Sequence, residues 1–222
     1  MLDYTLEKYY YENMNESSFI FFFLVVILKV KRDRPKYKQI VDAAVVVIAE
    51  NGYHQAQVSK IAKEAGVADG TIYLYFKNKE DILVSVFREK MGIFVNNLEV
   101  IIEKDVDTSE MLRKMILNHF RVLHEDRHLA IVTQLELRQS GKKLRFRINE
   151  VLKEYLDLLD IILKNGIEKG EIDETMDVRL ARQMVFGTID ETITSWVMNE
   201  QKYDLMKLAP EVHRLIMNGM KA

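Results

Sequence analysis

The sequence predicts an all-α protein with about nine helices. Apolar residues recur at intervals of three and four almost throughout, which is the spacing of helices that bury one face. No stretch shows the apolar–polar alternation of a half-buried strand. The 222 residues include only two prolines and nine glycines, so long loops are scarce, and a chain of this length can bury a sizeable core.

Four helices are expected in the first half of the chain, at residues 35–51, 58–65, 69–76 and 79–103. Pro35 suits the first position of the first helix, and Gly52 suits its end. Asp69 is the expected N-cap of the third helix, and Asn78 together with Asp81 caps the fourth. The fourth helix joins this part of the chain to the rest.

Five more helices are expected, at residues 107–124, 127–137, 142–169, 178–199 and 204–220. Gly170 ends the third of these, and Pro210 lies in the first turns of the last one. We therefore expect a three-helix head at residues 30–80 and a helical body at residues 81–222.

The segment VSKIAKEAGVADGTIYLYFKNK, from Val58 to Lys79, predicts a helix-turn-helix. Gly66 sits where the chain must reverse, and glycine reaches a positive φ without strain. The second helix of such a motif can enter the major groove of double-stranded DNA. The head is therefore expected to bind DNA.

The direction of each side chain on the second helix follows from about 100° per residue. Ile72 and Phe76 lie one turn apart and must face the core, so Leu74 points away from it. An outward leucine can contact a thymine methyl group, although a single exposed leucine is also ordinary on a protein surface. DNA contact is favoured by the surrounding residues of phosphate-binding types, which are Tyr73, Tyr75, Lys77 and Lys79. The candidate DNA-binding residues are Gln57, Ser59, Lys60, Gly70, Thr71, Tyr73, Leu74, Tyr75 and Lys79.

The distribution of charge agrees with DNA binding through one end. Residues 31–80 carry nine lysine and arginine residues against six acids, a net charge of +3. Since the whole chain has a formal net charge of −2, the remainder carries about −5. A basic head on an acidic body fits a protein that meets DNA with its head alone.

Residues suited to catalysis or metal binding are scarce. The chain has no cysteine, which excludes disulfides, cysteine-ligated zinc and a thiol nucleophile, and which suits a reducing cytoplasm. His119, His124 and His128 come from two neighbouring expected helices and could converge on a metal ion, but surface or hydrogen-bonded roles explain the five histidines more simply. We expect no enzyme, no cofactor and no metal.

A longer signature identifies a family. Residues 50–83 resemble the DNA-binding domain of the tetracycline-repressor (TetR) family. The residues that carry the resemblance are Gly52-Tyr53, Ile61-Ala62, Ala65-Gly66-Val67, Gly70-Thr71-Ile72-Tyr73, Tyr75-Phe76 and Lys79-Glu80. Residues 128–140 and 178–205 are similar to the TetR-type regulators of fatty-acid degradation found in bacilli. The resemblance covers roughly residues 31–222.

The resemblance implies a body that binds a long-chain acyl-CoA effector. An acyl tail needs an apolar tunnel, and the CoA phosphates need cations near its mouth. Core packing alone also explains the large apolar residues, and a solvated surface also explains the basic ones. The candidate ligand-binding residues are Phe94, Phe120, Leu123, Ile131, Leu135, Met184 and Phe186 for the tail, and Arg138 and Arg145 for the phosphates.

The helix expected at residues 178–199 carries apolar residues around most of its circumference, which is typical of a buried or paired helix. TetR-type proteins pack their last two helices against those of a second copy, so the resemblance implies a homodimer. A dimer sets two recognition helices one DNA turn or a multiple apart, which matches a palindromic operator.

Residues 1–29 have no place in the resemblance. Their apolar run, residues 19–28, is shorter than the roughly 17 residues that a membrane helix requires. Glu7, Glu12 and Glu16 precede it, whereas a signal peptide has a basic region before its apolar core. A membrane-surface anchor is one interpretation. We favour a mis-called translation start, with the chain beginning at Val30, which a GTG start codon would encode.

Together these observations predict a cytoplasmic, dimeric, ligand-responsive transcriptional repressor that binds palindromic operator DNA without binding a membrane. The expected effector is a long-chain acyl-CoA, and the expected targets are genes of fatty-acid degradation. One alternative is a TetR-type repressor that responds to another hydrophobic effector, such as a drug. The other is a membrane-attached helical interaction protein that uses residues 19–28.

Overall fold

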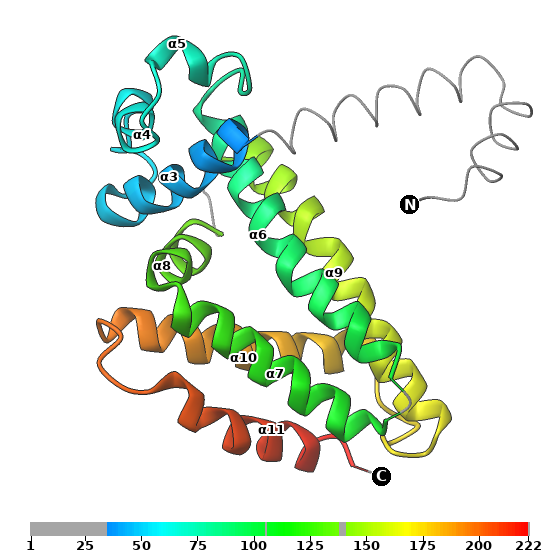
Figure 1. Cartoon of the computed structure of the whole chain (residues 1–222). Helices are drawn as coiled ribbons and strands as arrows, with labels where there is room; N and C mark the ends of the chain where they lie inside the picture. The colour runs from blue at the N-terminus through cyan, green and yellow to red at the C-terminus, as the bar shows by residue number, and fades with distance from the viewer. Residues whose placement is uncertain (1–34, 105, 138–140, 222) are drawn as a thin grey trace, which may run out of the picture.

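The computed structural model describes residues 35–104, 106–137 and 141–221, and these parts fold into nine α-helices and one short 3-10 helix (Figure 1). The described parts contain no strand, which confirms the predicted all-α fold. The proposed extension at residues 1–29 lies outside the described residues. Among the residues that are described, no helix is both long and apolar enough to cross a membrane.

Three helices form the head at one end of the molecule (Figure 1). They are α3 (Pro35–Asn51), α4 (Val58–Glu64) and α5 (Asp69–Ile72). One side of α3, including Ile40 and Ile48, is buried and packs against its neighbours in the head and against the helix that follows. Gly52 ends α3 with a φ of +72°, a left-handed conformation that favours glycine.

α6 (Lys79–Ile102) runs from the head into the body, parallel to and in contact with α9 (Lys142–Glu168) (Figure 1). The predicted cap of α6 is confirmed, because the Asn78 side chain accepts a hydrogen bond of 2.9 Å from the Asp81 backbone N–H. The rest of the body consists of α7 (Thr108–Glu125), α8 (Arg127–Glu136), α10 (Val178–Met198), the 3-10 helix η1 (Leu205–Leu208) and α11 (Ala209–Asn218).

The recognition helix α5 differs from the prediction at both ends. Its N-cap is Ala68, whose backbone is extended, and Asp69 is already helical, so the predicted cap was wrong by one position. The α-helix ends at Ile72 rather than at residue 76. The backbone N–H groups of Leu74 and Tyr75 bond to carbonyls three residues back, which makes the last turn tighter than an α-helix.

The helix predicted at residues 204–220 is divided between η1 and α11. Pro210 is the second residue of α11, and it has no N–H with which to continue the hydrogen bonds of the preceding turn. Asp204 caps η1 by accepting a hydrogen bond of 3.0 Å from the Met206 backbone N–H. The proline thus fixes the point where the tighter turn gives way to an α-helix.

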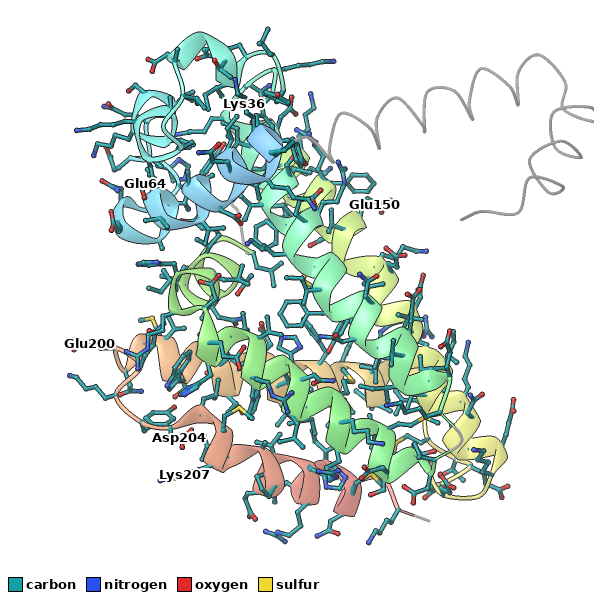
Figure 2. The ribbon with its side chains drawn as sticks, viewed as in Figure 1. Lys36, Glu64, Glu150, Glu200, Asp204 and Lys207 are labelled. Atoms are coloured by element: carbon teal, nitrogen blue, oxygen red, sulfur yellow. The ribbon has the colours of Figure 1, made fainter. Side chains whose placement is uncertain are left out.

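One continuous hydrophobic core runs through head and body. α3 packs against α8 as well as against α6, so the head is attached to the body at two places. Side chains fill the space between the facing helices, whereas labelled charged residues such as Lys36, Glu64 and Glu150 project outward (Figure 2). The boundary at residues 80 and 81 stays a prediction, because it falls inside the continuous helix α6.

Candidate functional site

The turn between α4 and α5 sets the direction of the recognition helix. Gly66 has a φ of +62°, as the sequence predicted, and the Val67 N–H closes the turn on the Ala62 carbonyl at 3.0 Å. Ile72 is completely buried, whereas Leu74 is 67% exposed. The predicted inward and outward faces are therefore confirmed, and the outward face is free to meet a partner.

Several of the candidate DNA-binding residues share one surface. Gln57, Ser59, Tyr73 and Lys79 line the same open hollow between the start of α4 and the turn after α5. Tyr73 is 59% exposed, and the space around Gly70 is open. Such a surface presents hydroxyl, amide and ammonium groups together, which are the groups that bind DNA phosphates.

Three of the candidates, including Lys79, have partners within the chain. The Lys79 ammonium donates hydrogen bonds of 2.9 Å to the carbonyls of Tyr53 and His54, which leaves one of its three N–H groups for a phosphate. Lys60 donates to Asn51 Oδ1 at 2.8 Å. Tyr75 is half-buried, with its ring packed near Phe76. Thr71, the last candidate of the set, is also half-buried.

Polar contacts from α8 and α9 of the body reach the head and the start of α6. Glu136 at the end of α8 accepts a hydrogen bond of 2.8 Å from the Tyr53 backbone N–H. Arg147 of α9 forms an ion pair with Asp81, with 2.6 Å between Nη2 and Oδ1. Neither contact was predictable from local sequence patterns, because the partners lie more than sixty positions apart.

Two small cavities lie inside the body, with volumes of about 20 Å³ and about 10 Å³. Phe94 of α6 and His119 of α7 line both of them. The larger cavity is also lined by Gln134 of α8, Leu152 of α9 and Phe186 of α10. Each cavity has room for about one water molecule, so a larger occupant requires these side chains to move.

A buried polar pair borders the cavities, with His119 lining both of them and Tyr155 lining the smaller one. His119 Nδ1 lies 2.9 Å from the Tyr155 hydroxyl, and the His119 ring lies 4.5 Å from the Phe94 ring. Burial lowers the pKa of His119 to about 4 and raises the pKa of Tyr155, so both groups are neutral at neutral pH. The sequence indication for His119 was its place on the buried stripe of α7, where it follows Met115 by one turn.

The cavity also borders polar groups on α8 and α10. Asp190 is buried, and so is Gln134. The side-chain amide of Gln134 can be oriented so that its nitrogen donates hydrogen bonds to both neighbours. These hydrogen bonds are 2.9 Å long to Asp190 Oδ1 and 2.9 Å long to Thr194 Oγ1. The wall of this cavity is therefore apolar on α6 and α9 and polar where α8 meets α10.

The structure brings together only part of the predicted ligand-binding set. Phe94, Leu123 and Phe186 line the larger cavity, and Phe120 is buried in the core without lining it. Leu135 is 49% exposed, so it lies on the surface of α8 rather than in the interior.

The other members of that set lie elsewhere. Ile131 is half-buried, and Met184 lies on an open groove on the outer side of α10. Arg145 is exposed near the start of α9, and Arg138 lies outside the described residues. In the described parts of the chain, no group of histidine and acidic side chains is placed to hold a metal ion.

The apolar circumference of α10 is explained largely by its own chain. Trp196 is completely buried, and its indole N–H donates a hydrogen bond of 2.7 Å to the Tyr203 carbonyl. Ile189 and Ile193 are buried as well, because α10 packs against α8, α9 and α11. The open groove on α10 is lined mostly by small and polar residues, including Gly187 and Thr192.

Comparison with protein families gives two adjoining matches. The family described as "Bacterial regulatory proteins, tetR family" matches residues 40–86, and the family described as "YsiA-like protein, C-terminal region" matches residues 87–219. The chain belongs to the tetR family of bacterial regulatory proteins. The two matches meet within α6, the helix that links head to body.

Relatives within the tetR family are transcriptional regulators. The fatty acid metabolism regulator protein of Bacillus subtilis is 64% identical over 190 residues, which cover 86% of this chain and 98% of that protein. Among solved structures, fatty acid degradation regulator FadR from Bacillus halodurans is 59% identical, with a TM-score of 0.81, and covers 83% of this chain and 100% of its own. The structure of FadR from Bacillus subtilis in complex with stearoyl-CoA is 64% identical, with a TM-score of 0.80. The match covers 82% of this chain and 98% of that one.

Proposed function

We propose that this tetR-family member is a dimeric repressor of fatty-acid degradation genes, acting in the cytoplasm as a regulator rather than as an enzyme. It binds palindromic operator DNA through its head and leaves the DNA when a long-chain acyl-CoA occupies its body. The observation that carries this proposal is the 64% identity to the Bacillus subtilis fatty acid metabolism regulator, over nearly the whole of that protein.

The head supports the DNA-binding part of the proposal. Tyr73 and Leu74 follow each other in the tight turn at the end of α5, and both side chains are exposed, whereas Ile72 is buried. Leucine suits a thymine methyl group, and tyrosine suits a backbone phosphate. The hollow beside them adds Gln57 and Ser59 at the start of α4. These residues are proposed to contact one half-site.

The body supports the effector part of the proposal. The larger cavity is lined by apolar side chains from α6, α9 and α10, including Phe94, Leu152 and Phe186. An acyl chain would enter by displacing these side chains, and each buried CH₂ group contributes about 0.8 kcal/mol of binding free energy. Affinity for the effector is therefore expected to rise with chain length.

The outer side of α10 is the proposed dimer surface. Gly187, Thr188 and Thr192 line its groove, and such small side chains allow the backbone of a second helix to approach closely. Exposed apolar residues flank the groove on α10 and α11, with Met198 67% exposed and Leu215 55% exposed. Gly187→Arg is expected to shift the protein toward monomer in sedimentation, whereas Gly187→Ala is expected to stay dimeric.

The deciding experiment is an operator-binding titration against acyl-CoAs from about four to about eighteen carbons, which relies on the gain in binding free energy per buried CH₂. We expect release by chains of about twelve carbons or more, weaker release by free fatty acid, and none by free CoA. A response that does not vary with chain length would reject acyl-CoA as the effector. It would leave a tetR-type repressor with a different hydrophobic effector.

A further inference from the structure

The ion pair between Arg147 and Asp81 connects the body to the turn that follows the recognition helix. Arg147 Nη2 lies 2.6 Å from Asp81 Oδ1, and Arg147 Nη1 lies 3.8 Å from Glu80 Oε2. The other oxygen of Asp81 accepts a hydrogen bond of 3.1 Å from the Lys77 backbone N–H. Arg147 of α9 therefore holds the Asp81 carboxylate, and this carboxylate in turn binds the backbone of the turn that follows the recognition helix.

The larger interior cavity lies close to this ion pair along both helices. Phe87 lines the cavity six residues after Asp81 on α6, and Leu152 lines it five residues after Arg147 on α9. At about 1.5 Å per residue, both steps amount to roughly 8 to 9 Å. α6 and α9 run side by side in the same direction (Figure 1). The ion pair therefore lies about one to two helical turns from the cavity along both helices, on the side of the head.

Solvent reaches the ion pair. The Arg147 side chain is 32% exposed and the Asp81 side chain is 23% exposed. Both line a hollow of about 270 Å³ beneath the recognition helix, together with Tyr73, Lys77 and Arg88. Three cationic side chains thus border a space that is open to a small anion. A guanidinium forms two parallel hydrogen bonds with a phosphate as readily as with a carboxylate.

We propose that the phosphate groups of the effector compete with Asp81 for Arg147, and that this exchange is how the head senses the ligand. The inference rests on the proposed function, since it assigns the regulation of that same site. When Arg147 turns to a phosphate, Asp81 loses its anchor on the body, and the turn at Lys77 is no longer held. The recognition helix then loses its fixed position relative to the body.

Competition makes a prediction that a merely structural ion pair does not. Arg147→Gln removes the group that both anions need, so it weakens operator binding and also weakens palmitoyl-CoA binding. Asp81→Asn removes only the competitor, so it weakens operator binding but strengthens palmitoyl-CoA binding. The substituted amide keeps an oxygen that can accept the Lys77 N–H. We expect changes of about five- to tenfold, within the usual range of coupling between two sites.

The experiment measures palmitoyl-CoA affinity in the absence of DNA and operator affinity in the absence of palmitoyl-CoA, on the full chain. Palmitate, which lacks phosphates, is the matched probe, and its affinity is expected to be the same in wild type and both variants. Lys153→Gln breaks the exposed ion pair between Lys153 and Asp157 on the same helix, and it is expected to leave both affinities unchanged. Arg147→Lys keeps the charge and is expected to lie between wild type and Arg147→Gln.

The outcomes separate the inference from the function on which it rests. If palmitoyl-CoA fails to release the wild-type protein from its operator, the proposed function falls, and the inference falls with it. If palmitoyl-CoA releases the wild type but Asp81→Asn binds it no more tightly, the competition is wrong and the repressor remains. Opposite shifts in palmitoyl-CoA affinity for Asp81→Asn and Arg147→Gln would establish the competition.

Discussion

The head and the body present their candidate contacts in opposite ways. In the head, Tyr73 and Leu74 are more than half exposed and contribute little to the core. In the body, Phe94, His119 and Tyr155 are buried and hold the helices together. Binding and folding can therefore be separated by substitution in the head, whereas in the body the same side chains serve both.

The largest effect on stability is expected from a charge in the body. Trp196 is completely buried and its indole N–H is hydrogen-bonded, so Trp196→Asp both leaves a cavity and buries an unpaired carboxylate. We expect a loss of unfolding free energy on the order of 5 kcal/mol, measured by urea denaturation. Trp196→Phe keeps an apolar ring and should lose much less. An unchanged urea midpoint for Trp196→Asp would mean that the indole is not in the core.

A second substitution in the body sharpens the comparison through pH. Burial holds the pKa of folded His119 at about 4, below the value of about 6.5 in an unfolded chain. As the pH falls through 6.5, the unfolded chain binds a proton that the folded chain does not, so stability is lost between about pH 6.5 and pH 4. From this residue alone we expect roughly 2 kcal/mol less unfolding free energy at pH 5 than at pH 7.

The control for this effect is His119→Gln, which cannot titrate. Urea unfolding of both proteins is measured at pH 7 and pH 5. Both proteins contain the same carboxylates, so the difference between their losses of unfolding free energy is the contribution of His119. The variant is expected to lose less stability on acidification than wild type, whatever its stability at pH 7. Equal losses in the two proteins would show that His119 is not held neutral by burial.

A smaller loss of stability is expected from Gly166→Ala, at the point where α9 packs close to the start of α7. A Cβ at Gly166 would lie 2.8 Å from Ile172 Cδ1 and 2.9 Å from the Thr108 side chain. Crowding of this kind costs about 1 to 3 kcal/mol, and alanine regains up to about 1 kcal/mol of helix propensity, so Gly166→Ala should destabilise by about 1 kcal/mol. Gly92→Ala on α6, where the space is open, should instead raise the melting temperature.

The smallest effect on stability is expected in the head. Tyr73→Ala should change the unfolding free energy by less than about 0.5 kcal/mol, as is usual for exposed sites. It should nevertheless weaken operator binding and reduce the salt dependence by roughly one unit per lost phosphate contact. Leu74→Ala should relax base preference instead. If Tyr73→Ala binds the operator like wild type at every salt concentration, the assignment of the outward face to DNA is wrong.

Local signals made much of the head predictable from the sequence. Asn78 and Gly66 act on their own immediate backbone, so their roles follow from short-range rules. The alternation of Ile72 and Leu74 between core and surface follows from helix geometry alone. Asp69 shows the limit of such rules, since a polar residue in the first turn marks a helix start only to within one position.

The body was less predictable because its contacts join distant parts of the chain. Apolar periodicity marked Phe94 and Phe186 but did not distinguish them from Leu135, which faces solvent. It also did not distinguish burial of Trp196 by its own chain from burial by a second copy. The pairing of His119 with Tyr155 depends on how α7 meets α9, which no local pattern specifies.

The packing of α3 on α8 has a consequence for engineering chimeric repressors. The head is bound to the body through the continuous helix α6 and through the hydrogen bond from Tyr53 to Glu136. A graft that moves residues 35–86 onto a foreign body would leave the α8-facing side of α3 without its partner. A working chimera therefore needs α8 and the start of α9 transferred together with the head, although these segments are separate in the sequence, because α8 packs on α3 and Arg147 of α9 binds Asp81.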